Sequence, residues 1–145
     1  MFYQKISTNT YIIRIRRGEQ VIKSLTKFCQ KLKIINAFFY GIGALDKFIL
    51  ANYNVDKQKY LDKKISGAYE LANITGNVFD SKDGLIIHAH AVLADEKMKP
   101  VAGHFVEGRV SGTVEIYFEK LNSKIAKKFD KETGLKLANL SKSVL

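Results

Sequence analysis

All three histidines of the chain fall between Ile87 and Phe105, as His88, His90 and His104. Successive side chains of a strand point to opposite faces, so a strand here would place His88 and His90 on one face. They would be separated by about 7 Å along the strand, at about 3.3 Å per residue. Imidazole nitrogen is a common ligand of Zn²⁺. The spacing therefore predicts a metal site in this window.

The third histidine can join the first two through a hairpin. The segment between the two histidine-bearing strands, residues 95–100, is short enough for a β-hairpin, which would bring His104 beside His88 and His90. Three protein ligands leave the fourth position of Zn²⁺ open. We therefore expect a divalent metal, with Zn²⁺ as first choice, and no cysteine-based structural site. The alternative is a group of hydrogen-bonded polar residues on a half-buried sheet face, at a subunit contact.

Carboxylates and amides near this window are candidates for a further role. Glu107 and Glu115 are the closest carboxylates in sequence, but a bulge at Gly103 would reverse the face on which they lie. Glu70 stands in an otherwise apolar strand, where a carboxylate usually needs a partner. Asn77 follows a glycine. We take Glu70 and Asn77 as possible ligand contacts; the alternatives are a solvent-facing residue and a turn cap.

The overall charge indicates which partners the chain attracts. Twenty-four Lys and Arg against fourteen Asp and Glu give a net charge of +10, and only four of the basic residues are arginine. Base reading and bidentate phosphate contacts favour arginine. The charge therefore predicts, at most, non-specific association with DNA.

Length and composition favour one domain over residues 1–145. Cys29 has no second cysteine with which to form an intramolecular disulfide, and it lies on an apolar helical stripe, where a buried thiol is expected. Met1 to Thr10 lacks the continuous apolar core of a signal peptide. The longest apolar stretch, Ala37 to Leu45, is too short to span a bilayer. We expect a cytoplasmic protein without a membrane partner.

Periodicity predicts the secondary structure. Apolar residues recur at helical spacing from Glu19 to Leu32, which predicts one amphipathic helix. A near-continuous apolar run at 34–45 predicts a central strand bent at Gly41 and Gly43. Further strands are expected at 11–16, 48–53, 59–65, 68–74, 85–94, 101 onward and 109–118, with short elements in 129–137. The predicted class is α+β, a mainly antiparallel sheet with one packing helix and short C-terminal elements.

The order of motifs resembles the plants-and-prokaryotes-conserved (PPC) domain family over most of the chain. The matching motifs are Arg16 with Gly18-Glu19, Gly41-Ile42-Gly43-Ala44-Leu45, Tyr53 with Tyr60, Gly67-Ala68-Tyr69-Glu70-Leu71, Thr75-Gly76-Asn77, His88-Ala89-His90-Ala91, Gly103-His104, Gly108 and Thr113-Val114-Glu115. The resemblance implies a compact domain that assembles as a homotrimer. It also implies that His88, His90 and His104 form a metal-binding unit.

The resemblance carries a DNA-binding expectation that depends on a motif this chain lacks. Plant members pair the domain with AT-hooks of the Arg-Gly-Arg-Pro type, whereas the only proline here is Pro100. Ala68 also stands where the plant proteins typically have arginine. Three functions remain: a trimeric PPC protein that binds DNA non-specifically, a metal-dependent enzyme or ligand-binding protein that uses the histidines, and an oligomeric scaffold.

Overall fold

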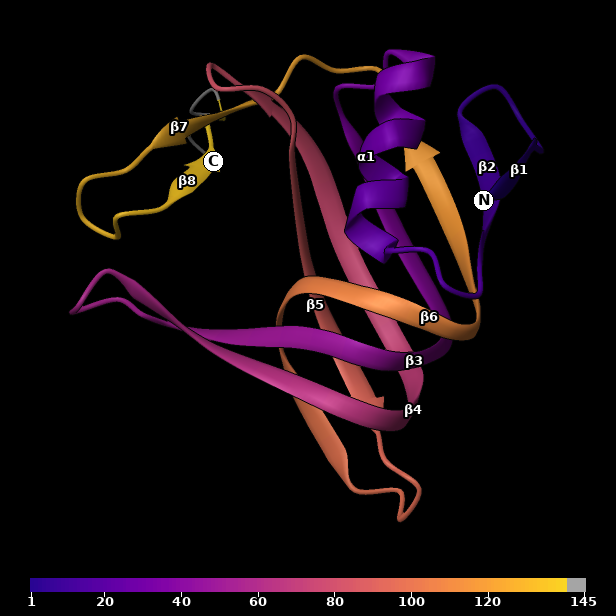
Figure 1. Ribbon diagram of the computed structural model, residues 1–145. Coiled ribbons are helices and arrows are strands. Elements are labelled where there is room, and N and C mark those ends of the chain that lie inside the picture. Colours follow the sequence, from indigo (N-terminus) through magenta and orange to yellow (C-terminus); the bar gives the residue numbers. More distant parts are fainter. Residues whose placement is uncertain (141–145) are drawn as a thin grey trace, which may run out of the picture.

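The computed structural model describes residues 1–140, which form one helix and eight strands. Figure 1 shows their arrangement. In chain order the elements are β1 (Phe2–Lys5), β2 (Thr10–Arg16), α1 (Val21–Leu32), β3 (Ala37–Asn54), β4 (Lys59–Ser81), β5 (Ile86–Ala94), β6 (Pro100–Lys120), β7 (Ala126–Phe129) and β8 (Lys136–Ala138). The mainly antiparallel sheet with one helix and short C-terminal elements agrees with the predicted class.

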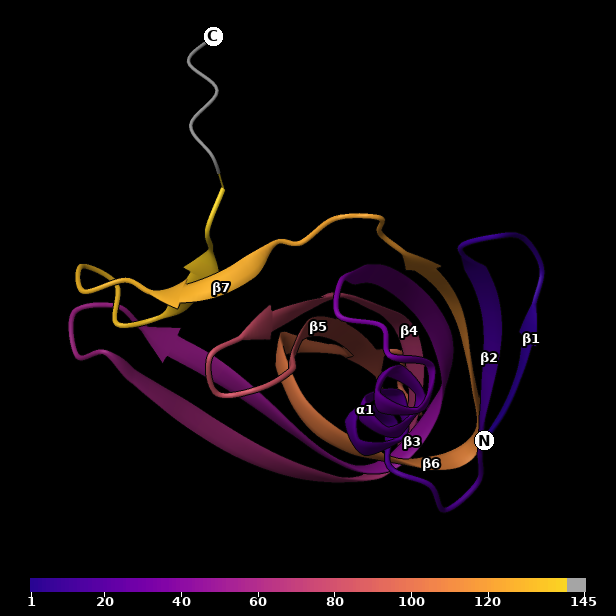
Figure 2. The same ribbon diagram turned by 90° about the horizontal axis from the view of Figure 1, so that it is seen from above.

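Four strands form a closed cycle of pairings. β3 pairs with β4 and β6, and β5 also pairs with β4 and β6, in every case antiparallel. Seen from above, these strands curl around, and α1 is viewed end-on within the curve (Figure 2). β2 and then β1 extend the sheet beyond β6. The pairing leaves each closing strand with an inner face toward the core and an outer face away from it.

Helix α1 covers the core with the stripe that the sequence predicted. Val21, Leu25, Phe28 and Cys29 are fully buried, and burial raises the pKa of the Cys29 thiol to about 12. The N-terminus of the helix is held from the sheet. Both carboxylate oxygens of Glu107 on β6 accept backbone N–H bonds, at 2.9 and 3.1 Å, from the first turn. Glu107 therefore fixes the helix rather than serving the histidines.

Several strands expected to be separate are continuous. The segments at 34–45 and 48–53 fall largely in β3, those at 59–65 and 68–74 in β4, and that at 109–118 is the second half of β6. Register shifts between Gly41 and Gly43 and between Leu45 and Lys47 bend β3 without ending it. A Cβ at Gly41 or Gly43 would overlap the β6 backbone, so these glycines permit close strand approach.

A second, smaller set of pairings attaches the C-terminal segment. β7 runs parallel to the end of β4 and antiparallel to β8. The turn between β7 and β8 lies near the tip of the long β3–β4 hairpin (Figure 1). Within residues 1–140, no helix is long and apolar enough to cross a membrane.

Candidate metal centre

The β5–β6 hairpin brings the three histidines together. His90 lies directly opposite His104 in the antiparallel pair, and His88 is two residues along the same face of β5. One ring nitrogen from each histidine can be chosen so that all three lie within 4.8 Å of one another. Ala89 and Ala91, between and beside the histidines of β5, face the core and are buried. The expected shared face and the hairpin connection are both present; metal ligation by these residues stays a prediction.

The donor set fits a divalent metal. Nitrogens bound tetrahedrally to Zn²⁺ at about 2.0 to 2.1 Å are about 3.3 Å apart, so side-chain adjustments of an ångström or so would complete the geometry. Nδ1 of His104 is buried and has no hydrogen-bond partner among the described residues. A buried polar atom without a partner is unfavourable unless something binds it. The cluster contains three histidines and, within residues 1–140, no carboxylate.

The surroundings keep two of these imidazoles neutral. Burial lowers the pKa of His88 to about 4, and the charges of Lys127 and the neighbouring histidines act in the same direction. Burial and His90 also lower the pKa of His104, against a smaller opposite effect of Asp62. Neutral imidazole is the form that binds a metal. Near pH 7 no proton therefore has to leave His88 or His104 before a metal binds.

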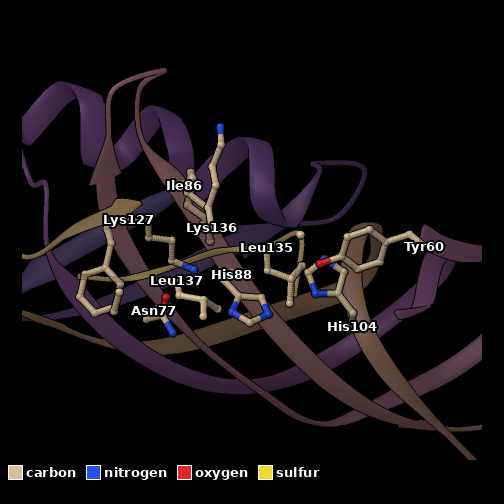
Figure 3. A pocket seen from close by; sticks show the side chains of 13 residues that line it. Tyr60, Asn77, Ile86, His88, His104, Lys127, Leu135, Lys136 and Leu137 are labelled. Carbon is tan, nitrogen blue, oxygen red and sulfur yellow. The ribbon is translucent and has the colours of Figure 1, made fainter. Parts of the chain in front are cut away.

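A cavity of about 490 Å³ is lined by two histidines of this cluster, His88 and His104 (Figure 3). Residues from β4, β5 and β6 line one side, and the β7–β8 segment forms the other. The lining residues are Tyr60, Asn77, Phe79, Ile86, Ile87, His88, His104, Lys127, Gly134, Leu135, Lys136, Leu137 and Ala138. The Tyr60 ring lies against His104, with centroids 4.9 Å apart. The pKa of the Tyr60 hydroxyl is raised, mainly by burial. The volume falls in the range of small-molecule sites, about 300 to 1,000 Å³.

The β7–β8 segment, which covers the cavity, is held where it begins and at its turn. The buried Asn36 side chain donates to the carbonyl of Ile125 at 2.7 Å and accepts from its N–H at 2.7 Å, just before β7. At the turn between β7 and β8, the hydroxyl of Tyr53 donates to the carbonyl of Thr133 at 2.7 Å. Lys136 Nζ and Asp83 form an ion pair at 2.6 Å. Hydrogen bonds and an ion pair therefore hold the β7–β8 segment in place as one wall of the cavity.

The structure separates the two further candidates from the sequence. Asn77 lines the cavity and lies opposite His88 in the β4–β5 pair, and its buried Oδ1 has no hydrogen-bond partner within residues 1–140. Glu70 is exposed, lies opposite Ala94 and does not line the cavity. This agrees with the alternative of a solvent-facing residue. Glu115 is also exposed, opposite Arg14.

Sequence reasoning missed Tyr60 and Lys127 as neighbours of the histidines. In the sequence, Tyr60 stands out only as part of a family motif, and Lys127 is one of many lysines. Lys127 reaches the site because β7 pairs with the end of β4, where Ser81 lies opposite it. No local spacing pattern predicts that contact, because it joins segments that are far apart in the chain.

Comparison with known proteins places this arrangement in a family. The model of the Plants and Prokaryotes Conserved domain, abbreviated PCC or PPC, matches residues 4–122, most of the chain. The chain belongs to this family. No curated protein matches the sequence.

Solved PPC-like structures support the same assignment. The plant- and prokaryote-conserved protein of Pyrococcus horikoshii has 33% sequence identity and a TM-score of 0.85, over 92% of this chain and 93% of that one. A Bacteroides thetaiotaomicron protein, provisionally described as DNA-binding, has 27% identity and a TM-score of 0.91, over 95% and 96%. A metal-containing protein of Archaeoglobus fulgidus has 20% identity and a TM-score of 0.84, over 97% and 99%. At that identity the last comparison shows the fold alone.

The lowered pKa of His88 predicts acid sensitivity of the metal-free PPC domain. The unfolded chain binds this proton below about pH 6.5, while the folded chain resists it down to about pH 4. Stability is therefore lost as the pH falls through this window. After a discount for partial exposure, we expect His88 to account for about 1 kcal/mol between pH 7 and pH 5.

Urea unfolding of the wild type and His88→Gln at both pH values, in chelator, measures this contribution. The variant should lose less stability on acidification than the wild type. An equal loss in the two proteins would show that His88 protonation is not coupled to folding.

Proposed function

We propose that this PPC-domain protein binds a divalent metal ion, Zn²⁺ as first choice, through His88, His90 and His104. The observation that carries the proposal is the convergence of three imidazoles from two paired strands at the edge of a cavity. Imidazole suits Zn²⁺, Cu²⁺, Fe²⁺ and Ni²⁺, whereas Mg²⁺ and Ca²⁺ prefer oxygen ligands. A protein of the same fold, from Archaeoglobus fulgidus, is described as metal-containing.

The open side of such a site faces a space that can admit a small molecule. With three protein ligands, a bound metal keeps a position free and supplies Lewis-acid chemistry there. Tyr60 and Asn77 lie beside this space. A ligand-binding or enzymatic role of the same site therefore remains the alternative within this proposal.

Metal binding is tested with protein stripped by chelator and titrated with Zn²⁺ by calorimetry, with elemental analysis of the reloaded sample. We expect one ion per chain. His90→Ala should weaken binding at least 100-fold, because two imidazoles bind far less tightly than three. Thr75→Val is the matched control, since Thr75 lies opposite His90 on the neighbouring strand but offers no imidazole.

Equal Zn²⁺ affinity in the wild type and His90→Ala would remove the proposal. In excess metal, the stability gain of the wild type should be about 2.7 kcal/mol at 100 times the dissociation constant. His90→Ala should gain little under the same conditions.

We further propose that the chain assembles as a homotrimer through the outer face of its sheet. Ile12, Tyr117 and Tyr40 lie side by side in register across β2, β6 and β3. Phe38 and Ile42 flank Tyr40 on β3, and the exposed fractions of Phe38, Tyr40 and Ile42 are 48%, 56% and 61%. We call these five residues the outer apolar strip. A contiguous apolar patch of this kind marks an interaction surface.

The trimer is tested by light scattering of the eluting protein. The wild type should have three times the 16.4 kDa mass of one chain. Tyr40→Glu should shift it toward the monomer, because burial of an unpaired carboxylate in the contact is unfavourable. Val55→Glu is the matched control, since Val55 is 50% exposed but lies outside the strip. A monomeric wild type, or a trimer unaffected by Tyr40→Glu, would contradict the proposal.

A second function, non-specific DNA binding, is favoured by the net charge of +10 and by relatives described provisionally as DNA-binding. We propose that it operates through lysine–phosphate contacts without base reading. Fluorescence anisotropy with labelled duplexes should show affinity that falls steeply with salt and is equal for AT-rich and mixed sequences. Absence of binding at 50 mM salt, or a strong AT preference, would count against this mode.

A further inference from the structure

One cation in the histidine cavity has no partner in the described part of the chain. Lys127 on β7 is half-buried and directs its ammonium group into the cavity on the side of His88 (Figure 3). None of the ion pairs within residues 1–140 includes Lys127. Lys136 on β8 differs, because its ammonium group is paired with Asp83. A partly desolvated charge without a counterion is unfavourable, and an anion would relieve it.

The backbone that carries Lys127 is fixed on both sides. Lys127 lies opposite Ser81 in the parallel pair with β4 and opposite Ala138 in the antiparallel pair with β8. Asn36 anchors Ile125, two residues before it, through two hydrogen bonds. The ammonium group therefore extends into the cavity from a strand whose backbone is paired with β4 and β8.

The rest of the cavity is suited to an organic molecule. Its walls include the apolar side chains of Phe79, Ile86, Leu135 and Leu137. Asn77 adds a buried Oδ1 that accepts no hydrogen bond from the described part of the chain and could accept one from a ligand. No arginine lines the cavity, so the bidentate fork that phosphate groups favour is absent from the described lining residues. Apolar walls with one lysine that has no ion pair among the described residues match a small carboxylate better than an inorganic oxyanion.

We propose that this cavity binds a small organic carboxylate, with its carboxylate at Lys127 and its apolar body against the walls from β4, β5 and β8. The inference rests on the proposed metal site in one respect. The open coordination position of that metal, at the histidines, would be a second point of attachment for the ligand. Lys127 lies beyond residues 4–122, the part matched by the family model. Membership of the PPC family therefore does not by itself imply this contact.

The test uses phenylacetate and its neutral counterpart phenylacetamide, which differ in charge but hardly in size. Each is titrated by calorimetry into the full-length protein, both Zn²⁺-loaded and metal-free. We expect loaded wild type to bind phenylacetate at least tenfold more tightly than phenylacetamide or inorganic phosphate. Lys127→Met should remove this preference, and Lys127→Arg should retain it. Lys128→Met is the matched control, because Lys128 is the exposed next residue and does not line the cavity.

Three results would overturn the inference: equal binding of the amide, an unchanged preference in Lys127→Met, or phosphate binding as tight as that of phenylacetate. The metal content of the same samples separates this failure from that of the metal proposal. Lys127→Met should still take up Zn²⁺, unlike His90→Ala. If the wild type takes up no Zn²⁺, the metal proposal fails. Lys127-dependent binding of phenylacetate to metal-free protein then supports the anion site, and its absence overturns it.

Discussion

The antiparallel pairing of β5 with β6 is the constraint on which the rest of the structure depends. It closes the cycle of β3, β4, β5 and β6, and the same ladder sets His90 opposite His104. A slip of one residue would turn the histidines of β5 toward the core and the buried Ala89 and Ala91 outward. Burial of the alanines against the core therefore specifies the face on which the imidazoles meet.

The cavity combines groups whose charges are coupled. Two neutral imidazoles favour a dication, whereas the nearby Lys127 ammonium opposes one. An anion between them would reduce that repulsion. Any ligand that binds both would therefore raise the affinity of the protein for the metal, and the metal would raise the affinity for the ligand by the same factor. In this arrangement the anion and the metal are expected to bind together more tightly than either binds alone.

Local patterns predicted the parts of the fold that depend on alternation and short connections. Period-two alternation placed His88 and His90 on one face, and the short connection expected at 95–100 brought His104 to them. The same patterns divided β3 and β4 into pieces. In β4, Ser66-Gly67 has the composition of a turn, but the ladder with β3 continues before and after it. The cover from β7 and β8 depends on pairing between distant segments, which spacing does not encode.

The outer apolar strip and the histidine cluster share one row of the sheet. Register places Tyr117, Tyr40, Thr75, His90 and His104 in succession across β6, β3, β4, β5 and back to β6. Thr75 alone separates the last tyrosine of the strip from the first histidine. His90 is exposed in the single chain, so a partner that covers the strip would approach this imidazole first. Assembly at the strip would then exclude water from the histidine cluster. The lysine-bearing wall and the proposed subunit contact would thus act on the same imidazoles, the first through charge and the second through exclusion of water.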